Sequence, residues 1–407
     1  MESQSPRREQ LAVDGGARRY DYIDCVRGYA ILLVITCHLT YSVPELPYPI
    51  HRITVFGWHG VQLFFLASCV TLLMSWNNEV RRFGAADARA FFVRRFFRIA
   101  PAYYLAAALY YFVSPPAGGF DALQLLTTLA FVNAWHPLLM PTEMSRWLVV
   151  PGGWSIGVEF TFYFLFPVIA VAITSLRRAL LFLAVTLCVG AILNSVTSAT
   201  LAARYSDAAV DNFIYFWFPN QFPVFALGSV VYFLIVMMGR PEFAAARRRV
   251  AANSTHCVVV SVAVVIGLAY VRLPHWLTLD PPYVPVFILV SLAFAGFIFA
   301  LSFAERGIFV NRPVQWMGKV SFSAYLLHYI VISTVTGRLS HVLMLDATGY
   351  RAILAFALLW VVTVLSVFIV SYVTYRAIEL PMISYGHAIA RRLTLGRASA
   401  KPGRAPI

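Results

Sequence analysis

His38 and Glu159 are ionisable side chains inside apolar stretches of the sequence that are long enough to cross a lipid bilayer. Such groups are costly in hydrocarbon, so each needs a structural or a chemical reason to be there. By helical rise, His38 is expected near mid-membrane and Glu159 about 8 Å below the outer edge. We therefore expect the two to meet, and an imidazole facing a carboxylate in a dry setting is suited to acid–base catalysis. The alternatives are a packing histidine and a buried glutamate paired with a structural arginine.

Two arginines, Arg95 and Arg98, precede an apolar run at a three-residue spacing, which puts them on one face of a helix. Two guanidinium forks on one face suit phosphate groups, because each fork matches two oxygens at once. The alternative is an ordinary anchor at the cytoplasmic end of a span, which explains the charge but not its position so close to the apolar run. The pattern therefore predicts a phosphate-binding mouth on the cytoplasmic side.

Three further side chains are candidates for an acceptor site or for its support. Ser155 lies in the same segment as Glu159, and Tyr325 and His328 are one helical turn apart at the start of a later apolar run. A tyrosine–histidine pair of this kind is as often core packing, and that alternative stays open. The five cysteines form no Cys-x-x-Cys pair and none lies in a loop that we place outside, so neither a disulfide framework nor a metal site is expected.

The elements that hold these side chains are predicted to be membrane-spanning helices. Hydrophobic residues make up 60% of the 407 and charged residues 12%, about half the charged fraction of a soluble domain. So much apolar side chain cannot be hidden behind so little polar surface, and we predict an all-α polytopic membrane protein. Ten apolar runs approach the ~20 residues needed to cross the hydrocarbon: 23–41, 57–76, 96–113, 154–174, 179–197, 213–238, 257–273, 283–304, 319–338 and 352–376.

Charge decides whether an eleventh apolar run, 122–139, crosses the membrane. If it does not cross and the N-terminus is cytoplasmic, 24 Lys and Arg residues fall inside and six outside, whereas a crossing makes the two sides equal. The positive-inside rule therefore predicts ten spans, both termini in the cytoplasm, and a re-entrant or interfacial segment at 122–139. The same clustering explains the net charge of +14 without nucleic acid as a partner. We expect a cytoplasmic tail at 1–20, a membrane domain at 21–385 and a basic cytoplasmic tail at 386–407, with disorder at 1–20 and 390–407.

Five sequence blocks, taken in order, closely resemble the acyltransferase-3 family of bacterial membrane O-acyltransferases. The matching features are Asp24-x-x-Arg27-Gly28 with His38; Gly60-Val61-x-Leu63-Phe64-Phe65; Arg95-x-x-Arg98-Ile99-x-Pro101; Trp154-Ser155-x-x-Val158-Glu159; and Ser323-x-Tyr325-Leu326-x-His328, followed by Glu379-x-Pro381. The resemblance covers residues 20–385, nearly the whole chain. It departs from the family after Phe65, where Ala67-Ser68-Cys69 replaces the more usual Leu-Ser-Gly, and we expect this to affect only packing in the second span.

The resemblance implies transfer of an acyl group, commonly acetyl, from cytoplasmic acyl-CoA to a hydroxyl of a glycan or a lipid-linked sugar in the bacterial inner membrane. Acyl-CoA, with acetyl-CoA as the first choice, would be a co-substrate, and no bound cofactor is implied. Carried over by residue, His38 and Glu159 are the expected catalytic pair. Arg27, Arg95 and Arg98 are the expected anchors for the CoA phosphates. Some members carry a fused extracytoplasmic domain, which this sequence does not show, so we expect transfer to finish within the membrane domain.

A transporter or flippase of a lipid-linked or polysaccharide substrate is the alternative, since it would also have about ten spans. Such proteins show inverted repeats and broken half-helices, which the sequence does not reveal. A membrane scaffold without catalysis is a third hypothesis, but it would not need a histidine, a glutamate and paired arginines at these depths. The acyl group, the acceptor, direct transfer against an acyl-histidine intermediate and the oligomeric state all stay open.

Overall fold

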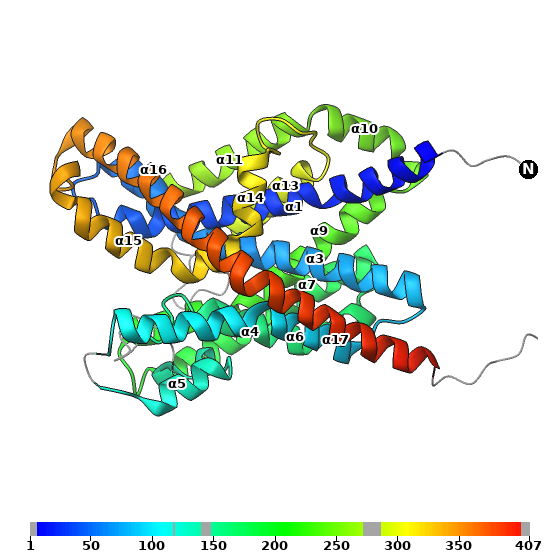
Figure 1. Ribbon diagram of the computed structural model, residues 1–407, viewed down its shortest axis with the longest axis horizontal. Coiled ribbons are helices and arrows are strands. Elements are labelled where there is room, and N and C mark those ends of the chain that lie inside the picture. The colour runs from blue at the N-terminus through cyan, green and yellow to red at the C-terminus, as the bar shows by residue number, and fades with distance from the viewer. Residues whose placement is uncertain (1–5, 117–118, 140–147, 272–285, 400–407) are drawn as a thin grey trace, which may run out of the picture.

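The computed structural model describes residues 6–116, 119–139, 148–271 and 286–399, and all regular elements in these ranges are helical (Figure 1). In chain order they are α1 (Pro6–Thr40), α2 (Tyr48–Val55), η1 (Phe56–His59), α3 (Gly60–Phe83), α4 (Ala88–Val113), α5 (Ala122–Leu129), η2 (Asn133–Trp135), η3 (Pro137–Leu139), α6 (Trp154–Ala172), α7 (Leu176–Leu201), α8 (Asp207–Phe216), α9 (Phe218–Met238), η4 (Pro241–Phe243), α10 (Ala244–Ala252), α11 (Ser254–Tyr270), α13 (Val286–Leu301), α14 (Arg312–Lys319), α15 (Ser321–Leu343), α16 (Gly349–Thr374), η5 (Tyr375–Glu379) and α17 (Leu380–Ser399).

Seven helical runs in the described ranges are long and apolar enough to cross a membrane, and the number rises to nine if each of two bent pairs forms one span. The first bent pair joins η4 and α10 to α11 at 66°, and the second joins α14 to α15 at 82°. The shorter apolar helix α13 is a further candidate. The prediction of an all-α polytopic membrane protein is confirmed, and the expected total of about ten spans is reached when α13 is added to the nine.

The two described ends of the chain lie at the same end of the molecule. Figure 1 shows the start of α1, the end of α17 and α10 toward one end, and α5 and the turn between α15 and α16 toward the other. This agrees with the ten-span path, in which the basic residues of α10 share a side with both termini. The structure differs from the prediction of disorder at the tails, because residues 6–20 belong to α1 and residues 390–399 to α17, and both stretches are helical.

The segment 122–139 contains only the eight-residue helix α5 and two short 3₁₀ turns, which is too little to cross the hydrocarbon. The side-chain amide of Gln124 donates to the Leu139 carbonyl at 3.1 Å, so the segment folds back on itself. Its middle packs on α6, where the rings of Phe131 and Phe160 stack with centroids 3.7 Å apart. The prediction that 122–139 is re-entrant or interfacial, and not a span, is confirmed.

Glycines let α14 cross α1 in backbone contact. A Cβ added to Gly28 would lie 2.2 Å from the Val314 carbonyl oxygen, and one added to Gly318 would lie 1.7 Å from the Asp24 carbonyl oxygen. Neither position has room for a larger residue unless the two helices move apart. The short helix α14 therefore lies across α1 near Arg27, and the 82° turn that follows starts α15 inside the bundle.

A π-helical turn, η5, joins α16 and α17 and supports the start of α15. Such turns insert a residue into a helix and are frequent at functional sites. The last residue of this one, Glu379, is 2% exposed and accepts hydrogen bonds from the backbone N–H of Ser323 at 2.9 Å and from the Ser323 hydroxyl. The first N–H groups of a helix lack intrahelical partners, so this carboxylate satisfies a donor that would otherwise be buried unpaired.

Reporter fusions test the path of the chain through the membrane. Fusions after Arg249 and at the C-terminus should report the same side, because α10 and the end of α17 lie at one end of the molecule (Figure 1). A fusion at Arg204 should report the opposite side, because α9 carries the chain across the bundle before α10 begins. A common side for Arg204 and Arg249 would contradict the ten-span path.

Candidate active site

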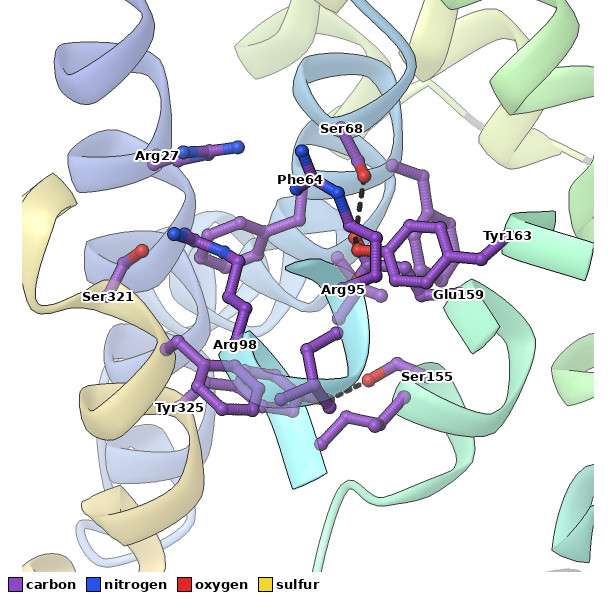
Figure 2. A pocket seen from close by; sticks show the side chains of 15 residues that line it. Arg27, Phe64, Ser68, Arg95, Arg98, Ser155, Glu159, Tyr163, Ser321 and Tyr325 are labelled. Atoms are coloured by element: carbon purple, nitrogen blue, oxygen red, sulfur yellow. Dashed lines mark hydrogen bonds between the residues drawn. The ribbon is translucent and has the colours of Figure 1, made fainter. Parts of the chain in front are cut away.

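A pocket between α1, α3, α4, α6 and α15 collects most of the side chains singled out in the sequence (Figure 2). Six of the eight line it: Arg27, Arg95, Arg98, Ser155, Glu159 and Tyr325. Ser68, Phe64, Tyr163 and Ser321 complete its labelled lining. The remaining two, His38 and His328, are not among the lining residues and form a separate cluster.

The three arginines gather at one side of this pocket (Figure 2). Arg27 donates to the Thr71 hydroxyl at 3.2 Å, and the Nε of Arg95 is buried with no hydrogen-bond partner. The Arg95 guanidinium lies over the Tyr163 ring, 6.0 Å from its centroid. In the described part of the chain, Arg27, Arg95 and Arg98 are absent from every ion pair. Half-buried positive charge without an ion-pair partner is suited to an anionic ligand.

The neighbouring Arg94, on the same helix, has a structural role and differs from the pocket arginines. Its guanidinium lies 2.6 Å from the Glu79 carboxylate, and it does not line the pocket. Arg95 and Arg98 follow the start of α4 by seven and ten residues, so they lie about 10 and 15 Å along it. The helix begins well before the apolar run does, and the cytoplasmic position of these arginines stays a prediction.

Glu159 is held by two hydroxyl groups at the level of the arginines. Ser68 and Tyr163 both donate to the same carboxylate oxygen, each at 2.6 Å. The carboxylate lies within Coulomb range of Arg27 and Arg95 without reaching ion-pair distance. Ser68 is the residue of the Ala67-Ser68-Cys69 stretch that keeps the family's Leu-Ser-Gly pattern, so the contact to Glu159 comes from the matching position and not from the two that depart.

The predicted contact between His38 and Glu159 is wrong. Thr71, which bonds Arg27, and Ser68, which bonds Glu159, are one turn apart on α3, so Glu159 lies at the level of Arg27. His38 follows Arg27 by eleven positions in the unbroken helix α1, which places it about 16 Å further along. The two side chains are therefore separated along the helix axis by about half of the ~30 Å hydrocarbon thickness.

The error arises from where α6 begins. The sequence prediction starts this helix at the outer edge of the membrane. In the structure a Cβ on Gly153, the residue before α6, would lie 2.6 Å from the Tyr103 hydroxyl, so α6 begins beside Tyr103. Tyr103 lies on α4, more than halfway from the outer end of that helix to Arg95 and Arg98. The re-entrant segment has already carried the chain inward before α6 starts, so Glu159 lies deeper than the prediction assumed.

His38 forms an aromatic cluster with His328 and Tyr329 of α15. Its Nδ1 is 2.8 Å from the Val34 carbonyl oxygen, which can only accept, so Nδ1 carries the proton of this bond. Its Nε2 is hydrogen-bonded to the Tyr329 hydroxyl, and in the neutral ring that nitrogen is the acceptor. The His328 ring lies 5.1 Å from the His38 ring between centroids, and its Nδ1 is 2.7 Å from the Tyr325 carbonyl oxygen.

Arg27 and His38 lie on the same face of α1. Eleven helical positions make three turns with about 20° left over, so the two side chains point in nearly the same direction. Helix α15 follows this face, from Ser321 at the arginine pocket to Tyr329 at His38. The arginine pocket and the imidazole cluster therefore lie along the same pair of helices, α1 and α15.

Tyr325 lies between these two ends. Its ring lines the arginine pocket and is 5.7 Å, between centroids, from the ring of His328. Its hydroxyl donates to the Gly152 carbonyl at 2.9 Å and accepts from the Ser155 hydroxyl at 2.7 Å (Figure 2). These bonds join α15 to the start of α6, so Tyr325 closes the outer side of the pocket in this conformation.

Sequence reasoning missed three residues that contact the candidate groups: Ser68, Tyr163 and Tyr329. Tyr163 had a usable signal, because it follows Glu159 by four positions and such pairs share a helix face. Ser68 had a weaker one, as the single hydroxyl in a stretch that was interpreted as packing. Tyr329 had none, since it lies in an apolar run beside a more conspicuous histidine.

Fold and site together define an all-helical membrane protein with a buried anion pocket and an imidazole cluster on one face of its first helix. A family profile described as an acyltransferase domain, Acyl_transf_3, matches residues 20–376. The chain belongs to this family of acyltransferase domains. The resemblance found in the sequence is confirmed, and the enzyme hypothesis is favoured over a transporter or a scaffold.

The chain is also similar to peptidoglycan O-acetyltransferase OatA of Listeria monocytogenes, with 22% identity over 382 residues. The match covers 89% of this chain and 56% of OatA, so the chain spans little more than half the length of that relative. No solved structure matches the chain.

A double-mutant cycle tests the bond that closes the pocket. Ser155→Ala and Tyr325→Phe should destabilise the protein by less in combination than the sum of their separate effects. The expected coupling is about 0.6 kcal/mol, the average for hydrogen bonds between helices of a membrane protein. Reversible unfolding in mixed micelles measures it. Ser155→Ala combined with Tyr385→Phe, at an exposed tyrosine, should show no coupling. Equal coupling in both cycles would show that the bond between Ser155 and Tyr325 does not stabilise the protein.

Proposed function

We propose that the protein transfers an acyl group, acetyl being the simplest, from acyl-CoA to a hydroxyl of a glycan or a lipid-linked sugar. Arg27, Arg95 and Arg98 would bind the CoA phosphates, and His38 would act on the acceptor hydroxyl. The observation that carries this proposal is the alignment of an anion pocket and an imidazole along one face of α1, about 16 Å apart.

The donor site is argued from charge. CoA carries its phosphates at one end and its thioester at the end of a long flexible arm, so the two ends need separate sites. The pocket supplies guanidinium groups that lack ion-pair partners in the described ranges, and such groups bind phosphate through paired N–H donors. The arm would then follow α15 past Tyr325, which must move, to bring the thioester to His38.

The reaction is argued from the hydrogen bonds of His38. An acceptor hydroxyl is a poor nucleophile at neutral pH, so a base must take its proton as it attacks. The proton passes to Nε2 of His38 while the hydroxyl oxygen bonds to the acyl carbon. The carbon–sulfur bond then breaks, and the leaving thiolate takes the proton back from the imidazolium. An acyl-histidine on the same nitrogen would use the same groups.

The backbone carbonyl of Val34 takes the part that the sequence assigned to Glu159. It accepts from Nδ1–H, fixes the ring orientation and stabilises the imidazolium that forms. Glu159 instead belongs to the donor end. Its carboxylate, fixed by Ser68 and Tyr163, partly balances the arginine charge before the donor binds and holds the guanidinium groups in position.

The acceptor class is proposed from the relative, and the location from the distribution of charge. The relative acts, by its name, on peptidoglycan, which supports a glycan hydroxyl as the acceptor class. The basic residues of α10 and α17 lie toward one end of the molecule, and the positive-inside rule supports a cytoplasmic position for that end. We accordingly place the protein in the bacterial inner membrane, with both termini in the cytoplasm and the imidazole cluster in the outer half.

Removal of one pocket arginine tests the donor site. Arg98→Ala should weaken acyl-CoA binding by roughly tenfold to a hundredfold, the usual cost of a lost hydrogen-bond partner to a charged group. Arg98→Lys should restore only part of the affinity, because an ammonium lacks the fork. Calorimetry on the purified protein in nanodiscs measures both. Arg89→Ala, on an exposed arginine of the same helix, is the matched control and should bind normally. Normal binding by Arg98→Ala would make this arginine a topology anchor.

Removal of the imidazole tests the chemical step. His38→Ala should abolish transfer while acyl-CoA still binds, since the arginines are untouched. The expected loss in kcat is on the order of a hundredfold or more, the scale of general acid–base catalysis. His256→Ala, at an exposed histidine of α11, should keep full activity. Transfer at the wild-type rate by the His38→Ala protein would show that His38 is a packing residue and that the proposed mechanism is wrong.

A further inference from the structure

The Tyr329 hydroxyl is hydrogen-bonded to Nε2 of His38, the nitrogen that must act as the base in the proposed reaction. The Val34 carbonyl fixes the proton of His38 on Nδ1, which leaves Nε2 as the basic nitrogen of the neutral ring. That nitrogen is already engaged by the Tyr329 hydroxyl. An acceptor hydroxyl can therefore reach Nε2 only by replacing the hydroxyl of Tyr329.

His328 adds a second acceptor atom to the same cluster. Its Nδ1 lies 2.7 Å from the Tyr325 carbonyl oxygen, so Nδ1 is the donor and Nε2 is an acceptor in the neutral ring. The His328 side chain is 0% exposed, and its Nε2 has no hydrogen-bond partner. A buried acceptor without a donor is costly, and ligands commonly supply such a donor.

The chemistry of these atoms defines what can bind there. Both imidazole nitrogens offer lone pairs, so the ligand must bring hydrogen-bond donors, and two donors must be close together because the rings are only 5.1 Å apart. A carboxylate or a phosphodiester has no proton to give at neutral pH. Neighbouring hydroxyls of a polyol fit this requirement. His38 and Tyr329 are half-buried, so the cluster is reachable from one side.

We propose that the cluster of His38, His328 and Tyr329 is the acceptor subsite, and that the Tyr329 hydroxyl holds the place of the reacting hydroxyl until a polyol displaces it. The reacting hydroxyl then donates to Nε2 of His38, and its neighbour donates to Nε2 of His328. This inference rests on the proposed function, because it takes His38 as the base.

The occupied nitrogen also protects the donor from water. If Nε2 were open, a water molecule would give it a proton and attack the acyl carbon, the carbon–sulfur bond would break, and the products would be free carboxylic acid and CoA. While Tyr329 donates to Nε2, water has no base, and the thioester survives until the acceptor arrives. Tyr329 is thus a positioning residue that separates transfer from hydrolysis.

The Tyr329→Phe variant tests this protection, since it keeps the ring and removes only the hydroxyl. With acetyl-CoA and no acceptor, its rate of thiol release should exceed the wild-type rate by roughly fivefold, the weight of one ordinary hydrogen bond. The increase should vanish in the Tyr329→Phe, His38→Ala double variant. Tyr350→Phe, at a tyrosine 73% exposed on α16, is the matched control and should hydrolyse at the wild-type rate. Unchanged or slower thiol release by Tyr329→Phe would overturn the proposal.

Chemical labelling tests the same shielding without the donor. Diethyl pyrocarbonate acylates imidazole nitrogens that have a free lone pair, and peptide mass spectrometry locates the label. His38 should be labelled about fivefold faster in Tyr329→Phe than in wild type, by the same hydrogen-bond argument. Exposed His256 serves as the internal reference. Equal labelling of His38 in both proteins overturns the shielding even if transfer proves to depend on His38. Conversely, wild-type transfer by His38→Ala removes the proposed function, while the labelling result still decides whether Tyr329 covers the nitrogen.

Two matched probes test the polyol requirement. Ethane-1,2-diol and ethanol differ by one neighbouring hydroxyl, and the wild-type enzyme should acetylate the diol about fivefold more efficiently per hydroxyl, because the second hydroxyl bonds His328. His328→Phe keeps a ring of similar size and should erase this preference. Equal use of the two probes by the wild-type enzyme, or a preference that survives in His328→Phe, contradicts the second contact.

Discussion

The presence of three half-buried positive charges inside the membrane-spanning part of the chain is the constraint on which the other features of the site depend. A guanidinium in hydrocarbon is costly, and no ion pair in the described ranges offsets the charge of Arg27, Arg95 or Arg98. The protein compensates in part, with a hydroxyl at Arg27, an aromatic ring beneath Arg95 and a carboxylate at a distance. The pocket is therefore suited to an anionic ligand, which would supply the remaining compensation.

Interrupted helices make this polar interior possible. A continuous helix satisfies its own backbone and presents only side chains, whereas the first turn of a helix exposes unpaired N–H groups. Helices α6 and α15 both begin inside the bundle, one after a re-entrant segment and the other after an 82° turn. Glu379 accepts from the Ser323 N–H at the start of α15, whereas at α6 the Tyr325 hydroxyl donates to the Gly152 carbonyl just before the helix. The bonds that satisfy these ends also fix the walls of the pocket.

The sequence predicted the features that depend on composition and local spacing. Apolar runs and the distribution of arginines identified the helices and the non-spanning segment, and three-residue spacing grouped Arg95 with Arg98. Depth was harder to predict, because charge counting gives the side on which a loop lies and not how far its chain returns into the membrane. Glu159 was therefore assigned to the wrong level. Tyr329 was missed because its position depends on α15 lying against α1, a long-range contact that no local pattern reports.

The unbroken stretch of α1 between Arg27 and His38 has a consequence for selectivity. A straight helix has a fixed rise, so neither side chain can approach the other by more than its own length. Under the proposed chemistry this stretch acts as a ruler that measures the donor from its phosphates to its thioester. A carrier with a shorter arm leaves its thioester below the imidazole, whichever acyl group it bears. The acyl group itself extends past the end of the ruler, so the choice among acyl groups falls to residues beyond His38, toward α2 and the outer ends of α15 and α16.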